Sequence, residues 1–164
     1  MSQVAVPPVE DLKAYRQALG AFATGVCVVT ADTPSGPVGI TVNSFTSVSL
    51  QPRLLLWCLD DRSERAPLFA AAERYVIQVL GADQRDAAAR FAKGDWALGE
   101  HEVRRVEGAP RLKESLAWFA CEAERQIQAG DHLMILGRVL THEASAGEGL
   151  TFHRGRFGVT ETGA

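Results

Sequence analysis

The sequence predicts a mainly β protein in which an antiparallel sheet closes into a barrel and helices pack on its outside. Two observations favour this class. Short apolar, β-branched segments follow one another as hairpins and do not alternate with helices as βαβ units do. A Gly-x-Gly-x-x-Gly loop after a strand is also absent, which argues against a doubly wound parallel sheet. In all, the pattern predicts about seven strands and about three helices.

The chain begins with a predicted helix over residues 9–22, because apolar side chains recur there every three or four positions. A β-branched run at 26–30 predicts a buried strand, and the turn residues at 32–37 lead into its hairpin partner at 38–42. Polar residues interrupt the apolar pattern over 43–49. The apolar side chains that define the first helix are Leu12, Tyr15, Leu19 and Phe22.

A further strand at residues 53–59 is followed by a predicted helix that Ser63 caps and that runs through residue 73. The next strand occupies 75–80. A second capped helix starts at Asp83 and runs through residue 91.

The last third of the chain predicts mostly strands. Residues 92–113 are rich in loop formers and give no clear element. Apolar residues favour strands at 118–127 and 132–141, separated by a turn at Gly130, and a final strand at 150–153.

Composition and charge limit the classes of protein that the chain can be. Its 164 residues are 46% apolar and 23% charged, which is typical of a globular domain. We expect a disordered arm at 1–8 and a single domain at 9–164. The formal net charge of −3 disfavours a nucleic acid or an anionic membrane as partner, because those partners need surplus Lys and Arg.

The cysteines and the missing motifs limit the location and the metal chemistry. The three cysteines lie far apart, which is typical of reduced thiols. Neither a signal peptide nor an apolar run of about 20 residues is visible, so we expect a cytoplasmic protein that does not cross a membrane. His-Glu-x-x-His and closely spaced Cys or His pairs are absent, so we expect no metal site.

Short polar side chains crowd the segment 41–49, between strong strand formers. Such side chains let hydroxyl and peptide N–H donors approach a flat polar ring or a phosphate. The alternative is a solvated bend with no ligand. The polar members are Thr41, Asn43, Ser44, Thr46, Ser47 and Ser49.

Three further groups of residues have the chemistry of a binding site. Arg62 and Ser63 follow a buried strand at a predicted helix start, which suits an anion, although a capped surface helix is the alternative. His132 begins a long strand after a turn, where it is either a pocket residue or an ordinary polar one. Arg156 and Phe157 suit a pyrophosphate and a ring, or else form a basic terminal hairpin.

In their order along the chain, these segments resemble the flavin reductase-like family, the short-chain reductases of two-component flavin monooxygenases. The resemblance extends from about Tyr15 to Gly158. The matching blocks are Phe22-Ala23-Thr24-Gly25-Val26, Thr41-Val42-Asn43-Ser44-Phe45-Thr46-Ser47-Val48-Ser49, Arg62-Ser63, Phe91-Ala92, Gly130-Asp131-His132, Gly137-Arg138-Val139 and Arg154-Gly155-Arg156-Phe157.

The resemblance implies an FMN-binding split β-barrel, usually a homodimer. It implies a flavin reductase that passes a hydride from NADH or NADPH to FMN or FAD and supplies reduced flavin to a separate monooxygenase. It implies that His132 is the catalytic residue near the nicotinamide. The implied flavin-binding residues are Thr41, Val42, Asn43, Ser44, Ser47, Val48, Ser49, Cys58, Leu59, Arg62, Ser63, Phe91, Arg156 and Phe157.

Two other functions suit the same barrel. One is a flavin-binding protein without reductase turnover, and the other is an oxidase of the pyridoxamine-phosphate oxidase type. The Gly130-Asp131-His132 block favours the reductase through the family resemblance. From the residues alone, Cys58 reads as an inert thiol in an apolar strand, because no activating neighbour is visible.

Overall fold

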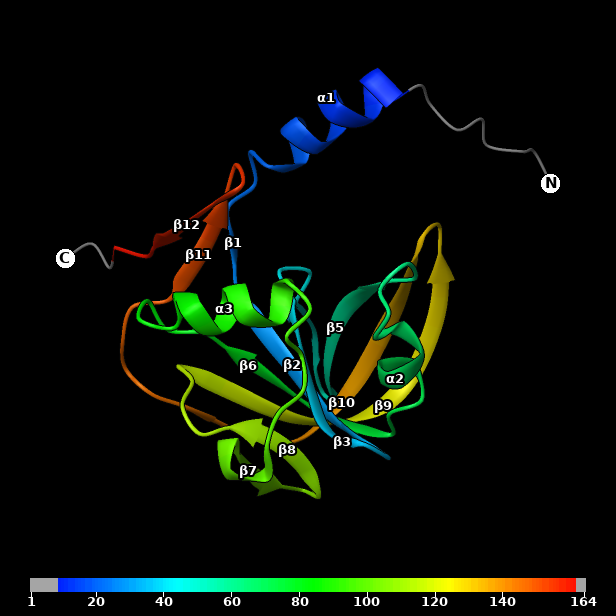
Figure 1. Cartoon of the computed structure of the whole chain (residues 1–164), viewed down its shortest axis with the longest axis vertical. Helices are drawn as coiled ribbons and strands as arrows, with labels where there is room; N and C mark the ends of the chain where they lie inside the picture. Colours follow the sequence, from blue (N-terminus) through cyan, green and yellow to red (C-terminus); the bar gives the residue numbers. More distant parts are fainter. Residues whose placement is uncertain (1–8, 162–164) are drawn as a thin grey trace.

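The computed structural model describes residues 9–161 and is mainly β, with a few short helices (Figure 1). The predicted disordered arm at 1–8 lies outside the described residues, as do residues 162–164 at the end of the predicted domain. Side chains are described from Asp11 onward. None of the helices within residues 9–161 is long and apolar enough to span a membrane.

The described chain contains twelve strands, three α-helices and one 3₁₀ helix. The helices are α1 (Val9–Leu19), α2 (Ala66–Ala70), α3 (Arg85–Ala92) and η1 (Glu100–Glu102). The strands are β1 (Thr24–Gly25), β2 (Cys27–Thr33), β3 (Gly36–Val42), β4 (Thr46–Leu50), β5 (Arg53–Asp60), β6 (Arg74–Val79), β7 (Val103–Val106), β8 (Ala109–Leu112), β9 (Ala117–Ala129), β10 (His132–Ala144), β11 (Leu150–His153) and β12 (Arg156–Val159).

All seven predicted strands are present, as β2, β3, β5, β6, β9, β10 and β11. The strands that the sequence did not predict are β1, β4, β7, β8 and β12. Strand β4 escaped prediction because it is an edge strand whose residues are almost all exposed, so it lacks the alternation that marks a half-buried strand. Strands β7 and β8 occupy much of the segment 92–113.

All three predicted helices differ from the structure in their boundaries. The helix predicted over 9–22 ends at Leu19, so Phe22 lies beyond it. The helix predicted over 63–73 is only α2, because Ser63 accepts the Arg65 N–H in the preceding turn, at 3.3 Å, and the N-cap is Arg65. At the far end, the Glu73 carbonyl already accepts the Ala123 N–H of β9, at 2.8 Å. The helix predicted from Asp83 starts at Arg85, and its N-cap, Gln84, makes no side-chain capping bond.

The main sheet has seven antiparallel strands in the order β3-β2-β6-β9-β10-β5-β4. Strands β3 and β4 are its two edges and share no ladder within the described residues, so the hydrogen-bonded sheet is open. The expected closed barrel is therefore not confirmed. A second sheet joins β1, β11 and β12, and a third pairs β7 with β8.

The two edges of the main sheet are nevertheless joined by only three residues, 43–45, because β3 ends at Val42 and β4 begins at Thr46. If the seven strands lay flat, about six spacings of about 4.8 Å would separate the edges by about 29 Å. The chain from Val42 to Thr46 spans at most about 14 Å. The sheet must therefore roll until its edges approach each other at this corner.

The Ser44 side chain stabilises this corner by hydrogen bonds to β5. The residue continues the β4–β5 register, in which Thr46 faces Leu56, to the position opposite Cys58. The Ser44 Oγ accepts the Cys58 N–H at 2.9 Å and donates to the Cys58 carbonyl at 3.1 Å. A side chain thus takes the place of a backbone ladder pair where the chain turns from one edge to the other.

The core of the rolled sheet includes a close approach at Gly137 in β10. A Cβ on this residue would stand 2.1 Å from the Tyr75 hydroxyl and 3.2 Å from the Cys121 Cβ. Tyr75 and Cys121 are both buried. Packing therefore explains why glycine stands in the Gly137-Arg138-Val139 block.

Helix α1 projects from the body of the molecule, close to the β11–β12 hairpin (Figure 1). The Arg154 N–H of that hairpin donates to the Gly20 carbonyl at 2.9 Å. The predicted apolar side chains are exposed, and three of them lie on α1 whereas Phe22 follows it. Leu12, Tyr15, Leu19 and Phe22 are 39%, 61%, 56% and 77% exposed.

We predict that Ser44→Ala lowers the free energy of unfolding by about 1–3 kcal/mol, because it leaves the Cys58 N–H and carbonyl without partners. Urea denaturation measures the change. The matched control is Ser35→Ala in the exposed β2–β3 turn, with an expected change within about 0.5 kcal/mol. Equal effects from both substitutions would contradict the role of Ser44 at the corner.

We also predict that Gly137→Ala lowers the free energy of unfolding by about 1–3 kcal/mol, because the added methyl overpacks the core against Tyr75. Removing the hydroxyl with Tyr75→Phe in the same chain should recover part of this loss, as a double-mutant cycle would show. Gly25→Ala is the control, since a Cβ there meets nothing within 4 Å. An additive cycle would exclude the clash.

Candidate functional site

A hollow of about 580 Å³ lies at the corner between β3 and β4, beside the end of β5 and the start of β10. Most of the predicted site residues line it, although they come from distant parts of the sequence. They are Thr41, Val42, Asn43, Ser44, Cys58, Arg62, Ser63 and His132. The hollow is completed by residues that the sequence did not single out for binding, namely Ile40, Asp60, Arg65 and Ala92.

The hydroxyl groups of the predicted polar segment hold the protein together at this point. The Thr41 Oγ1 donates to the Ala88 carbonyl of α3 at 2.7 Å. The Ser44 Oγ is occupied by both backbone groups of Cys58. These two hydroxyls therefore fix the walls of the hollow, and they can still accept a hydrogen bond but have no proton left to donate to a ligand.

The outer edge of β3 provides further donors and acceptors. Part of this edge is paired with the segment 96–98. The Leu98 N–H donates to the Pro37 carbonyl, and the Gly39 N–H donates to the Trp96 carbonyl, each at 2.9 Å, so the peptide groups of Pro37 and Gly39 point away from β2. In an antiparallel strand the same side recurs every second residue. The N–H and carbonyl of Thr41 therefore also point away from β2, on the side of β3 that adjoins the hollow.

Successive side chains of β5 point to opposite faces of the sheet, so the two predicted flavin-binding residues Cys58 and Leu59 face in opposite directions. Leu55, Trp57 and Leu59 point into the core, whereas Cys58 faces the other side and lines the hollow. Leu59 is thus a core residue. The Cys58 thiol is partly buried, and desolvation raises its pKa.

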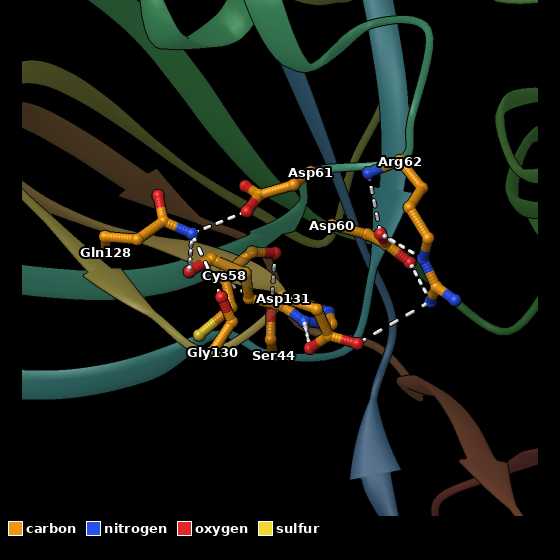
Figure 2. Close-up of polar contacts among 9 residues, drawn as sticks. Ser44, Cys58, Asp60, Asp61, Arg62, Gln128, Gly130 and Asp131 are labelled. Carbon is orange, nitrogen blue, oxygen red and sulfur yellow. Dashed lines mark hydrogen bonds and ion pairs between the residues drawn. The ribbon is translucent and has the colours of Figure 1, made fainter. Parts of the chain in front are cut away.

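Arg62 is already paired. Its Nε donates to the Asp60 Oδ1 at 3.0 Å and its Nη2 donates to the Asp60 Oδ2 at 2.8 Å, which is a two-pronged ion pair (Figure 2). The hydrogen bonds from Arg62 lower the pKa of Asp60 to about 2. The Arg62 side chain is 66% exposed, and its Nη2 also lies 3.9 Å from Asp131.

The β9–β10 turn is tied to the end of β5. The Asp61 N–H donates to the Asp131 carbonyl at 3.1 Å, and the Gln128 side chain donates to Asp61 at 2.5 Å and to the Gly130 carbonyl at 3.2 Å (Figure 2). His132 follows this turn, and its Nδ1 lies 2.8 Å from the Asp131 Oδ1. The turn therefore sets the position of the His132 ring at the hollow.

Arg65 is the cation that the sequence did not single out. It is half-buried, and its Nη1 donates to the carbonyls of Gly39, at 3.3 Å, and of Phe91. Within residues 11–161, no carboxylate lies within 4 Å of it. No local pattern marked Arg65, because the Gly39 and Phe91 carbonyls that hold it each lie 26 residues away in the sequence.

Other predicted site residues lie outside this hollow. Ser47, Val48 and Ser49 are on β4, where the ladder with β5 is irregular. The Phe91 ring is buried against Gly39, where a Cβ would stand 2.8 Å from the ring.

Arg156 and Phe157 line a separate hollow of about 450 Å³ in the β11–β12 hairpin. None of the residues that line it also lines the hollow at the corner.

Comparison with known proteins gives consistent relatives. FMN reductase (NADH) SmoA of Agrobacterium fabrum is 44% identical over 162 residues, which cover 94% of this chain and 90% of that protein. A probable flavin reductase of Rhizobium meliloti is 44% identical over 156 residues, or 90% of this chain, which spans 48% of that longer protein.

A solved structure of the NADH:FAD oxidoreductase SgcE6 of Streptomyces globisporus, in complex with NAD and FAD fragments, has the same fold. Its TM-score is 0.83 at 36% identity, with 98% of this chain and 99% of that chain covered.

The family described as "Flavin reductase like domain" matches residues 19–161, which is most of the chain and includes every residue of the hollow. This match agrees with the resemblance that the order of the sequence blocks predicted. The chain belongs to the flavin reductase-like domain family.

Proposed function

We propose that this protein is an NADH-dependent flavin reductase that reduces FMN or FAD and supplies reduced flavin to a separate monooxygenase. One observation carries the proposal: a single hollow combines the β3 edge at Thr41, the His132 ring and the guanidinium of Arg65, which has no carboxylate within 4 Å among residues 11–161. SmoA and SgcE6, whose names state NADH with FMN or FAD, support it.

The groups of the hollow suit a flavin nucleotide. A flat ring with alternating donors and acceptors matches peptide groups on a strand edge, such as those of Thr41, because both lie nearly in a plane. A phosphate matches a guanidinium without a carboxylate partner. Cys58 adds an apolar thiol on the wall of the hollow. No protein nucleophile is needed for this assignment.

The flavin supplies the redox chemistry, since it takes the hydride that NADH releases as it becomes NAD⁺. The contribution of the chain is binding and alignment. His132 is the proposed catalytic residue, held through its Nδ1 by Asp131 and assigned to the nicotinamide. Thr41, Val42, Asn43, Ser44, Cys58 and Ser63 are the proposed flavin-binding residues that line the hollow.

A homodimer is a further part of the proposal. The exposed apolar face of α1 needs a partner, because apolar patches of this kind mark interaction sites. A second copy of the chain is the occupant that we propose, since a two-fold dimer is the commonest assembly. Such a dimer would also give Arg156 and Phe157 a role, because these residues lie outside the hollow of their own chain.

The remaining assignments concern the architecture and the location. We assign the fold as a split barrel, which the three-residue corner between the sheet edges supports. We assign residues 9–164 to one domain, and the family match over 19–161 supports this. A cytoplasmic location is supported by the three free cysteines, since thiols stay reduced there.

We predict that the purified protein oxidises NADH only when FMN or FAD is added, as measured by the loss of NADH absorbance. Flavin binding without NADH oxidation would instead indicate a flavin-binding protein. Oxygen uptake with an organic amine and no need for NADH would indicate an oxidase.

His132→Gln should lower kcat about tenfold to hundredfold through lost alignment, with flavin affinity retained.

The matched control for His132 is His101→Gln, because His101 is exposed on η1 and does not line the hollow. Its kcat should equal that of the unaltered protein. An equal loss of kcat in both variants, or none in His132→Gln, would remove His132 from the proposed mechanism.

We predict that the protein sediments as a dimer and that Leu19→Asp shifts it to a monomer, because a carboxylate would be buried in the apolar α1 contact. Analytical ultracentrifugation measures the shift. Leu50→Asp is the control, since Leu50 is 91% exposed but lies on β4 and not on α1. Dissociation by both substitutions would place the interface elsewhere.

A further inference from the structure

The hollow contains two arginines in opposite electrostatic situations. Both the Nε and the Nη2 of Arg62 donate hydrogen bonds to the Asp60 carboxylate, so the negative charge of Asp60 balances the positive charge of this guanidinium. The Nη1 of Arg65 donates to two neutral carbonyls, of Gly39 and Phe91, and no carboxylate of residues 11–161 reaches it. Among the described residues, Arg65 therefore has no carboxylate in ion-pair contact, and Glu64, next to it in the chain, balances only part of its charge at longer range.

Partial burial of Arg65 strengthens the interaction of its charge with an anion. Arg65 is half-buried, and desolvation lowers the pKa of its guanidinium. A cation that has lost part of its hydration gains more from an anion than an exposed one does. Arg62, by contrast, is largely exposed and already paired.

The pairing of Arg62 also opposes an anion at that residue. Hydrogen bonds from Arg62 hold the pKa of Asp60 at about 2, so this carboxylate is ionised at neutral pH. A phosphate that approached Arg62 would meet the negative charge of Asp60 or have to displace it. Asp131, whose carboxylate lies 3.9 Å from the Arg62 Nη2, adds a second negative charge.

We propose that Arg65 is the specificity-determining residue of this hollow and binds the phosphate of a nucleotide substrate, while Arg62 braces the rim between Asp60 and Asp131. This inference rests on the proposed function. The phosphate belongs either to the flavin nucleotide or to NADH, because both bring the same group. The guanidinium is well placed for it, since its contacts to Gly39 and Phe91 hold it against β3 and the end of α3.

The test compares flavins with and without a phosphate. Riboflavin lacks the phosphate of FMN, so the ratio of their dissociation constants measures what the phosphate contributes. Quenching of flavin fluorescence gives both constants without turnover. In Arg65→Gln we expect the riboflavin-to-FMN ratio to fall about tenfold to hundredfold, which is the range for a hydrogen bond to a charged group. Arg65→Lys keeps a charge and should retain part of the ratio.

The matched control is Arg53→Gln. Arg53 also donates to a backbone carbonyl, that of Leu140 at 3.3 Å, but it is exposed and lies at the opposite end of β5. Its ratio should be unchanged. Arg62→Gln completes the set, and we expect it to change the ratio less than Arg65→Gln does.

The outcomes separate the sources of the phosphate. A lower riboflavin-to-FMN ratio assigns Arg65 to the flavin phosphate. An unchanged ratio with a KM for NADH raised about tenfold or more, measured with riboflavin as acceptor, assigns it to the dinucleotide.

Two results would overturn the proposal. One is an equal rise of both dissociation constants with an unchanged KM for NADH, which would make Arg65 only a tie between β3 and α3. The other is a ratio lost in Arg62→Gln but kept in Arg65→Gln. A protein that binds FMN but does not oxidise NADH would refute the proposed function and leave the flavin test of Arg65 valid.

Discussion

The arrangement of this protein depends on one constraint, the three-residue connection between the two edges of its seven-stranded sheet. A flat sheet cannot satisfy it, because the edges would stand about 29 Å apart and the connection spans about 14 Å. The sheet must roll, and Ser44 fastens the corner by binding both backbone groups of Cys58. The hollow lies at this corner, so the connection that forces the roll also creates the site.

The corner also determines which groups a ligand meets. The hydroxyls of Thr41 and Ser44 donate their protons within the protein, whereas the N–H and carbonyl of Thr41 point away from β2 on the side that adjoins the hollow. Charge is divided in the same way, because Arg62 is paired with Asp60, whereas Arg65 has no carboxylate within 4 Å in the described part of the chain. An NADH-dependent flavin reductase needs such a site, in which the protein aligns two nucleotides and the cofactor carries the chemistry.

Helix α1 and the β11–β12 hairpin do not line the hollow of their own chain. Helix α1 exposes its apolar face, and the β11–β12 hairpin holds Arg156 and Phe157 in a separate hollow. Both lie on the same side of the molecule, where the Arg154 N–H reaches the Gly20 carbonyl (Figure 1). The proposed homodimer would cover this surface with a second copy of the chain.

The amino-acid pattern was enough to predict the seven strands whose apolar residues are periodic, and the order of the sequence blocks was enough to predict the family. The sequence missed β4, whose exposed residues leave no pattern, and it placed Ser63 as a helix cap because capping residues look alike in a turn. The folded chain was needed to show that Cys58 lines the hollow while Leu59 does not. It also showed that Arg62 pairs with Asp60, whereas Arg65 has no carboxylate within 4 Å among residues 11–161. Periodicity indicates which residues are buried, whereas the surroundings of Arg65 depend on the Gly39 and Phe91 carbonyls, which lie 26 residues away in the sequence and reach it only in the folded chain.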